Sequence, residues 1–273
     1  MTGTTIRRGD VMKSRSGELQ NRHDGTFAWK TAVAAGLNLP GLRGLWTMGS
    51  FDENGDQYDL SGQGRTLSYN GNPTYSNDGL IPYLALDGTG DYLNRADEAG
   101  LDILGTETYI AAAQRGLTLG GWFRFDRLTA AEFLIGKGTV ITATSSYWLL
   151  FRGDIAGDPI RFQVSDGAAV DTVDLNLTTA PTTATWTFVC GRYDPSTEIK
   201  VWASQGTLES NTNAVGIPAA LNNSGADFTI GAPSGAAGNL LDGQVGLCFL
   251  STMLLSNTIV SAFYHHTRAL YGI

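Results

Sequence analysis

The chain has 273 residues, of which 42% are hydrophobic and 16% are charged, and its formal net charge is −8. This composition is typical of a globular protein with a sizeable core. No run of 18 apolar residues occurs, so we expect no membrane span. The opening residues are basic and hold no apolar segment of the secretory type, so we expect no signal peptide.

The net charge is distributed unevenly along the chain. Residues 1–45 hold seven basic and three acidic side chains, a net charge of +4, and the remainder holds 11 basic and 23 acidic ones, a net charge of −12. We expect this basic arm to dock on the acidic body of a neighbouring copy. A nucleic acid is the disfavoured partner, because the acidic body would repel a duplex. The candidate assembly residues are Arg7, Arg8, Lys13, Arg15 and Arg22.

Residues 1–41 are polar and weakly patterned, which predicts an extended N-terminal arm. Within it, TFAWKTAVAA at 26–35 is a candidate short helix, with Asp24 near its start and Gly36 as its C-cap.

From Gly41 onward, short runs rich in β-branched and aromatic residues alternate with clusters of Gly, Asn, Asp, Ser and Pro. Many short strands with polar turns predict a sandwich or a barrel. Ser256 is the expected cap of a short helix that runs through NTIVSAFYHHTRALYG. The expected strands are 43–48, 81–86, 91–94, 117–126, 132–136, 146–152, 159–165, 169–175, 185–193, 198–204, 227–231 and 243–252.

The two cysteines, Cys190 and Cys248, both lie in strand-like runs. We favour buried free thiols, and a disulfide between adjacent strands is the alternative. The three histidines lack partners at metal-ligand spacings, so no zinc site is predicted.

Ten short segments follow one another in a characteristic order between about residue 42 and residue 271. They are GLW, FDENG, DLSGQGR, LALDGTGDYL, LTLGGWFRFD, WTFVCGRYD, IKVWASQG, FTIGA, LDGQVG and LLSNTIVSAFY. This order resembles the concanavalin A-like, laminin-G-like and pentraxin-like jelly-roll superfamily. The resemblance implies an all-β, concanavalin A-like jelly-roll β-sandwich of two antiparallel sheets. Residues 1–41 would form the arm and residues 42–273 the sandwich, with a short C-terminal helix.

Catalysis is not expected. Glucanases of the resembled superfamily place two glutamates and an aspartate at alternate positions of one strand. This chain has no Glu-x-Asp-x-x-Glu pattern, no Gly-x-Ser-x-Gly motif and no histidine beside either cysteine. His265 and His266 are expected on the surface of the terminal helix.

The stretch FDENGDQYDLSGQGR is a candidate calcium-binding loop. Its first three alternate oxygen side chains, as in an EF-hand loop, are Asp52, Asn54 and Asp56. Gln57 replaces the required glycine and Gln63 replaces the bidentate glutamate, which excludes an EF-hand. Calcium on a jelly-roll loop stays open as a hypothesis, against the alternative of plain turn chemistry. No cofactor is expected to be obligatory.

Sugar binding requires aromatic platforms and a few fixed polar groups. The loop SYNGNPTYSNDG offers Tyr69 and Tyr75 as candidate glycan-binding residues, and a plain surface connection is the alternative. Five tryptophans lie inside predicted strands and are expected in the core: Trp46, Trp122, Trp148, Trp186 and Trp202.

These observations favour a non-enzymatic structural or adhesive protein. The combination of arm and sandwich resembles laminin-G-like proteins of tailed bacteriophages. It implies a subunit of a virion (capsid decoration, tail or fibre) or of another extracellular filament. Its partners would be itself, other virion proteins and surface glycans. The alternative is a free lectin-like carbohydrate-binding module, calcium-dependent or not.

Overall fold

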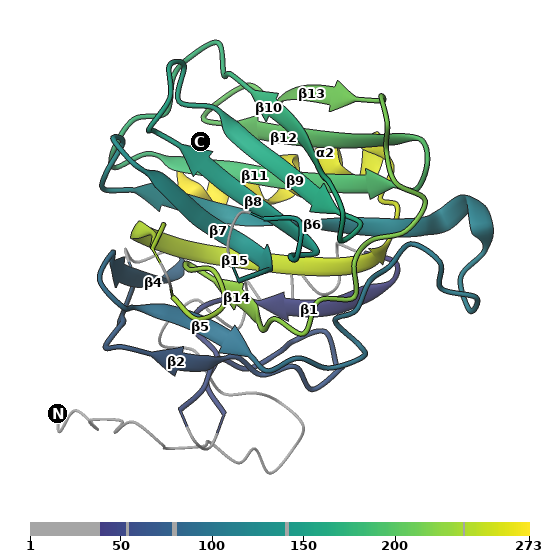
Figure 1. The fold of residues 1–273 in the computed structure, drawn as a ribbon. Helices are drawn as coiled ribbons and strands as arrows, with labels where there is room; N and C mark the ends of the chain where they lie inside the picture. Colours follow the sequence, from purple (N-terminus) through teal and green to yellow (C-terminus); the bar gives the residue numbers. More distant parts are fainter. Residues whose placement is uncertain (1–38, 53–54, 78–80, 140–141, 237) are drawn as a thin grey trace, which may run out of the picture.

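A computed structural model describes residues 39–52, 55–77, 81–139, 142–236 and 238–273. Two antiparallel sheets pack face to face as a β-sandwich, and a short helix lies near the C-terminus (Figure 1). The predicted helix at 26–35 and the five candidate assembly residues fall outside the described residues. No helix in the described ranges is long and apolar enough to cross a membrane.

The first sheet has eight strands, in the order β13-β12-β11-β6-β15-β4-β3, with β1 also paired to β15. The long strand β15 pairs with β4 through residues 242–245 and with β1 through residues 248–251, so β1 and β4 follow each other along the same edge of β15. The strands are β1 (Leu42–Trp46), β3 (Thr74–Asn77), β4 (Pro82–Asp87), β6 (Arg115–Phe125), β11 (Trp186–Asp194), β12 (Glu198–Ser204), β13 (Glu209–Asn213) and β15 (Asp242–Met253).

The second sheet has seven strands, in the order β10-β9-β8-β7-β14-β5-β2. They are β2 (Ser68–Asn70), β5 (Tyr92–Arg95), β7 (Ala131–Lys137), β8 (Tyr147–Arg152), β9 (Ile160–Ser165), β10 (Val170–Leu175) and β14 (Phe228–Ile230). All their pairings are antiparallel. Each of the twelve predicted strands matches one of the observed strands, and the two-sheet architecture is confirmed.

The core between the sheets follows from the alternation of side chains along each strand. On the central strand β6, Leu117, Leu119, Phe123 and Phe125 are fully buried in the cluster between the sheets. Trp122, at the intervening position, points to the outer face of the eight-stranded sheet and belongs to a second apolar cluster. This sheet is therefore apolar on both faces.

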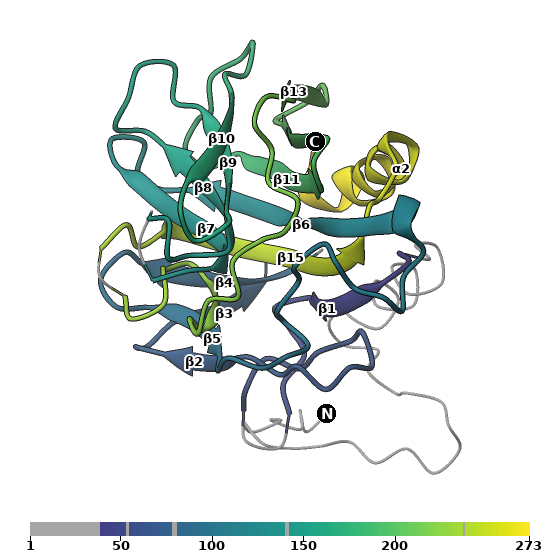
Figure 2. The same cartoon turned by 45° about the vertical axis from the view of Figure 1, so that its right-hand side comes forward.

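The helix α2 (Asn257–Thr267) covers part of that outer face, as Figure 2 shows. It begins as predicted at Ser256, whose side chain accepts a hydrogen bond from the backbone N–H of Ile259. Tyr264 and Phe263 of the helix pack on Phe188 of β11, and Trp122 stacks on Tyr264. Aromatic packing thus fixes the helix on the sheet.

The helix is shorter than predicted, because α2 ends at Thr267 and the 3₁₀ helix η2 (Arg268–Tyr271) follows. The change brings Tyr271 flat against Trp122, with 4.4 Å between ring centres. Its hydroxyl accepts a 2.7 Å hydrogen bond from the backbone N–H of Leu247. A side chain at Gly246 would collide with the Tyr271 ring, so this glycine makes the close approach possible.

The two cysteines are free and buried, as favoured from the sequence. Cys248 belongs to the cluster between the sheets and Cys190 to the cluster beneath the helix. Burial raises the pKa of both thiols well above the ordinary value. Neither thiol is therefore a nucleophile at neutral pH.

Candidate functional site

The loop between β1 and β2 is organised by the buried carboxylate of Asp59. Its two oxygens accept hydrogen bonds from the backbone N–H groups of Leu45 (3.0 Å), Ser61 (2.8 Å) and Arg65 (2.9 Å), and from the Ser61 hydroxyl (2.7 Å). The Trp46 indole N–H also donates to the Arg65 carbonyl, at 2.8 Å. These contacts fix the loop to β1, because an ionised carboxylate is the strongest acceptor available to backbone N–H groups.

The loop carries an exposed phenylalanine that joins the two predicted tyrosines. Phe51 contacts Tyr69 of β2 edge to face at 6.0 Å between ring centres, and Tyr75 of β3 at 5.3 Å. Phe51 is 41% exposed and Tyr75 is 38% exposed. Since β2 and β3 are the last strands of opposite sheets, the three rings span one edge of the sandwich. We call Phe51, Tyr69 and Tyr75 the edge aromatic cluster.

Polar groups of the same loop and strand lie beside these rings. The Tyr69 hydroxyl donates to Gln57 Oε1 at 3.4 Å, and the Ser68 hydroxyl donates to Asp56 Oδ2 at 3.2 Å. Gln57 is fully buried, so the polar groups left at the surface beside the rings are the Ser68 hydroxyl and the Asp56 carboxylate. Aromatic faces together with such polar groups are the chemistry that a sugar requires.

The candidate calcium ligands Asp52 and Asp56 take part in the hydrogen bonds of a turn. Asp52 Oδ1 accepts the backbone N–H of Asp56 at 2.9 Å, and Gly55 donates to the Asp52 carbonyl at 3.1 Å, which is turn chemistry. Asn54 lies outside the described residues. Among the residues that are described, no group of three or more His, Cys, Asp or Glu side chains is placed to hold a metal ion. Calcium binding therefore stays a prediction.

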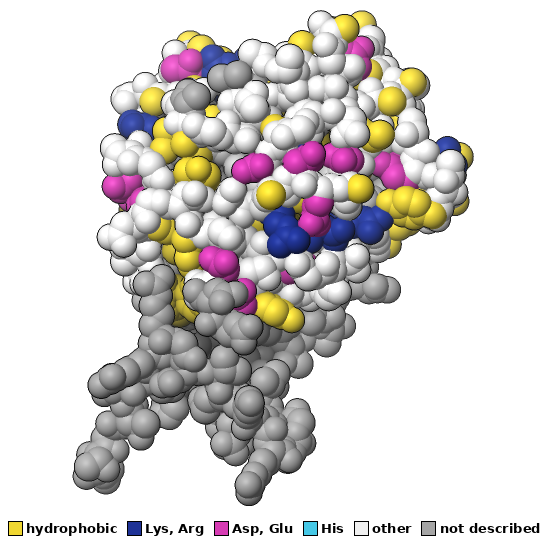
Figure 3. Space-filling view, turned by 60° about the horizontal axis from the view of Figure 1, so that its bottom comes forward, with side chains coloured by type: hydrophobic (Ala, Val, Ile, Leu, Met, Phe, Trp, Pro, Cys, Tyr) yellow, Lys and Arg dark blue, Asp and Glu magenta, His cyan; other side chains and the backbone are white. Residues whose placement is uncertain are grey.

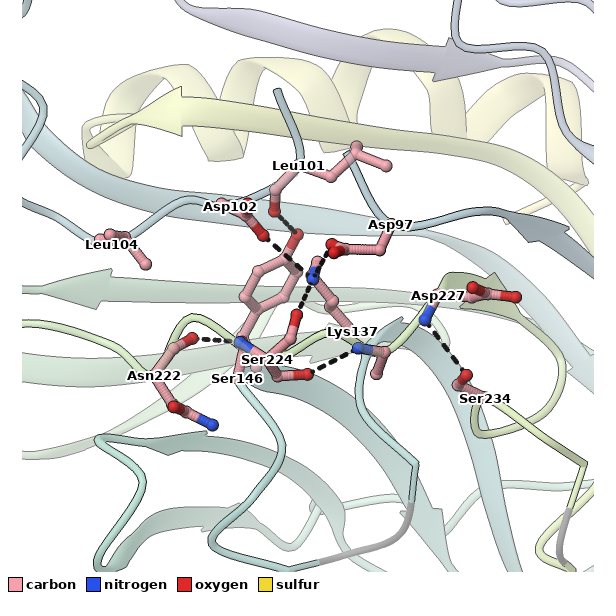
Figure 4. Close-up of polar contacts among 12 residues, drawn as sticks. Asp97, Leu101, Asp102, Leu104, Lys137, Ser146, Asn222, Ser224, Asp227 and Ser234 are labelled. Carbon is pink, nitrogen blue, oxygen red and sulfur yellow. Dashed lines mark hydrogen bonds and ion pairs between the residues drawn. The ribbon is translucent and has the colours of Figure 1, made fainter. Parts of the chain in front are cut away.

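A second group of polar side chains surrounds Lys137 at the end of β7 (Figure 4). Its ammonium group is fully buried, 2.6 Å from Asp97 Oδ1 and 3.0 Å from Asp102 Oδ1, and it donates to the Ser224 carbonyl. Beside it, Ser146 donates to the Asn222 carbonyl. The two carboxylates already neutralise a buried cation, so we assign this cluster to the stability of the loops around it.

Basic side chains gather on the face shown in Figure 3, next to a row of acidic ones. Three arginines lie together in the structure: Arg65 donates to the Arg43 carbonyl, and Arg65 and Arg95 both pair with Glu98, at 2.7 and 2.8 Å. Arg43 contacts the exposed Tyr109. Because carboxylate and guanidinium groups are interleaved here, the surface is of mixed sign.

Glu132, on β7, is a carboxyl group enclosed in the protein. Its Oε1 accepts hydrogen bonds from Arg127 Nε (2.9 Å) and from the backbone N–H of Asp242 (3.3 Å), whereas Oε2 has no partner in the described part of the chain. Burial raises the pKa of Glu132 to about 8, outweighing the lowering effect of Arg127. The side chain is fully buried and does not reach a substrate surface.

Comparison with protein-family models found no match for this chain, and neither did a search of curated proteins. Solved structures do resemble it. The receptor-binding domain of botulinum neurotoxin serotype G matches with a TM-score of 0.60 and 10% identity, over 83% of this chain and 51% of the toxin domain. A structure of botulinum neurotoxin type C, whose cell entry depends on interaction with two ganglioside molecules, matches with a TM-score of 0.61 and 12% identity, over 85% of this chain and 53% of the toxin chain.

A third similar structure is domain 4 of AbnA, an extracellular arabinanase from Geobacillus stearothermophilus, in complex with arabinotriose. It matches with a TM-score of 0.52 and 12% identity, over 81% of this chain and 97% of that domain. The chain spans about half the length of the toxin domains. At these identities the likeness establishes the fold alone, a β-sandwich.

Proposed function

We propose that this chain is a non-enzymatic binding module with a concanavalin A-like sandwich, and that the edge aromatic cluster binds carbohydrate. The observation that carries the proposal is that the exposed Phe51 contacts both Tyr69 and Tyr75, which come from edge strands of opposite sheets. Tyr75 is exposed, and Tyr69 is partly buried against the core. The similar structures support a binding role, since one holds arabinotriose and another concerns gangliosides. In this proposal the rings stack on a sugar face and the loop side chains supply hydrogen bonds.

Replacing Tyr75 or Phe51 with alanine is expected to weaken binding of the glycan selected on an array about tenfold, equivalent to ~1.4 kcal/mol. Tyr75→Phe is expected to retain most of the affinity, because it keeps the ring. Titration calorimetry measures each variant, with arabinotriose as a defined first probe. Adding a chelator, and testing Asp52→Ala, reveals in the same assay whether calcium takes part.

Tyr109→Ala is the matched control, because Tyr109 is 68% exposed and is not part of the edge aromatic cluster. Its affinity should equal that of the unsubstituted protein. Silence across a broad glycan array contradicts the proposal. So does a Tyr75→Ala variant that binds as tightly as the original.

We also propose that the basic N-terminal arm assembles copies of this protein into a virion or an extracellular filament, with the sandwich loops turned outward. The supporting observation is the net charge of +4 within residues 1–45 against −12 for the remainder. Of the seven basic residues counted, Arg43 belongs to β1. The other six precede the described part of the chain.

Changing Arg7, Arg8, Lys13, Arg15 and Arg22 together to glutamine is expected to yield a folded monomer, as is deletion of residues 1–38. The deletion stops before Leu39 because that side chain is buried and Ser251 donates to the Pro40 carbonyl at 2.7 Å. Light scattering after size exclusion measures the mass. Assembly of the full chain should weaken as salt rises. Unchanged assembly in both variants would contradict the proposal that the arm mediates assembly.

A further inference from the structure

A row of polar and aromatic side chains crosses the outer face of the eight-stranded sheet, beyond the part that α2 covers. Arg124 of β6 lies directly opposite Trp186 of β11 on one side and Gln244 of β15 on the other. Gln244 pairs in turn with Ala85 of β4, two residues after Tyr83. Because side chains alternate along a strand, Tyr83, Gln244, Arg124 and Trp186 share one face.

The guanidinium group of Arg124 is held in a fixed position within this row. Its central carbon lies 5.4 Å from the ring centre of Tyr83 and 5.4 Å from that of Trp186. Its Nε donates to Gln244 Oε1, and Gln244 Nε2 donates to Asp126 Oδ2 at 2.6 Å. Two aromatic contacts and one hydrogen-bonded edge thus orient the cation before any ligand arrives.

Hydrogen-bond donors in this row are left unused. No carboxylate of the described residues forms an ion pair with Arg124, and its terminal nitrogens donate no hydrogen bond to a described residue. Trp186 is only 4% exposed, and its indole N–H is buried without an acceptor in the described ranges. Because the Trp186 N–H is enclosed, the donors in this row that a ligand can reach are those of the partly exposed Arg124.

We propose that Tyr83, Arg124, Trp186 and Gln244 form a second binding site, which takes the carboxylate of an acidic sugar. The open edge of a guanidinium fork binds a carboxylate through two parallel hydrogen bonds. The Trp186 ring lies against the guanidinium group, and the half-buried Tyr83 ring provides an apolar surface for the sugar. Tyr83 pairs with Ser76, so this site lies on the opposite face of the β3–β4 ribbon from Tyr75.

The indole N–H signals of the six tryptophans report on the site directly. In ¹H–¹⁵N spectra of the full chain, Trp186→Phe assigns the Trp186 signal by its disappearance. Titration with D-glucuronate is expected to move that signal and to saturate, because a carboxylate bound to Arg124 changes the electric field at the indole ring against which Arg124 lies. D-glucose should leave it in place, and acetate should shift it with at least tenfold weaker affinity.

Arg124→Gln is expected to abolish the shift with glucuronate, and unchanged signals of the other five tryptophans show that the variant is folded. Arg115→Gln is the matched control on the same strand: Arg115 donates to the Ile110 carbonyl and has no carboxylate partner among the described residues, and its loss should leave binding intact. Tyr75→Ala should also leave it intact, which separates this site from the edge aromatic cluster.

Four outcomes overturn the proposal. The first is a Trp186 signal that glucuronate does not move, and the second is an equal shift in Arg124→Gln. The third is an equal response to glucose, which removes the carboxylate from recognition. Acetate acting as strongly as glucuronate overturns the assignment to an acidic sugar.

Discussion

Replacing Asp59 with alanine is expected to lower the free energy of unfolding by about 4 kcal/mol. The carboxylate is 1% exposed and accepts four hydrogen bonds, three of them from backbone N–H groups of Leu45, Ser61 and Arg65. Alanine leaves these donors without their acceptor, at a cost of about 1–3 kcal/mol for each one that water does not reach. For a domain of this size, such a loss lowers the melting temperature by roughly 10 °C.

Urea denaturation and thermal melting of the two proteins measure this effect. Asp56→Ala is the matched control from the same loop, because within the described ranges the Asp56 side chain accepts a single hydrogen bond, from the Ser68 hydroxyl at 3.2 Å. This variant should cost less than about 1 kcal/mol. Asp59→Asn should fall between the two, since the amide keeps one acceptor oxygen. An Asp59→Ala variant as stable as Asp56→Ala would show that the loop does not depend on this carboxylate.

Asp59 also shows which contacts can be predicted from the sequence and which cannot. The motif Asp59-x-Ser61-Gly62 resembles a turn of the jelly-roll superfamily, and that turn is present, with Gly62 at a φ of 80°. The hydrogen bond that the Leu45 N–H donates to Asp59 spans 14 residues and joins the turn to β1. Local pattern predicts the turn, whereas the long-range contact depends on how β1 and the loop pack.

The strands that the sequence missed share one physical property. β2, β3 and β13 are short, polar and at the sheet edges, with the sequences SYN, TYSN and ESNTN. An edge strand buries little on either face, so it lacks the apolar alternation that reveals a central strand such as β6. Because their segments lack apolar alternation, Tyr69 and Tyr75 were predicted to lie in a loop, although each belongs to an edge strand.

The candidate sites were predictable only in part. Tyr69 and Tyr75 stood out because two tyrosines lie in a polar, glycine-containing segment. Phe51 was not singled out, because its contact with both rings depends on the fold of the Asp59 loop. Arg124 and Trp186 are 62 positions apart in the sequence numbering and meet through the register of β6 and β11, which no local pattern encodes.

Between about pH 5 and pH 8, the stability of this protein is expected to fall as the pH rises, because of Glu132. Burial raises the pKa of this carboxyl group in the folded protein from an ordinary 4.5 to about 8. Below pH 4.5 the group is protonated in both states and carries no penalty. Above that pH the unfolded chain releases the proton and the folded protein keeps it, so stability falls by about 1.4 kcal/mol per pH unit until the folded pKa is reached.

Groups whose pKa is lowered in the folded protein act in a different range. Hydrogen bonds that backbone N–H groups donate to the carboxylates of Asp87 and Asp166 lower their pKa, and a hydrogen bond donated by Arg152 lowers the pKa of Asp154. Their contribution to stability is present above the ordinary pKa of about 4 and is lost as the pH falls through the folded value. The fall in stability above pH 5 therefore comes from a group whose pKa is raised in the folded protein, and substituting that group tests this assignment.

Glu132→Gln is expected to remove that decline and to make the protein more stable than the original by a few kcal/mol at pH 9. The amide keeps an oxygen for Arg127 Nε and for the Asp242 N–H, and it carries no charge into the interior. Urea denaturation at half-unit steps from pH 5 to pH 9 measures both proteins. Glu209→Gln, at the exposed edge strand β13, controls for the loss of one glutamate charge. Parallel stability curves for the original and Glu132→Gln would show that the ion pair with Arg127 keeps Glu132 ionised, against the dominance of burial argued above.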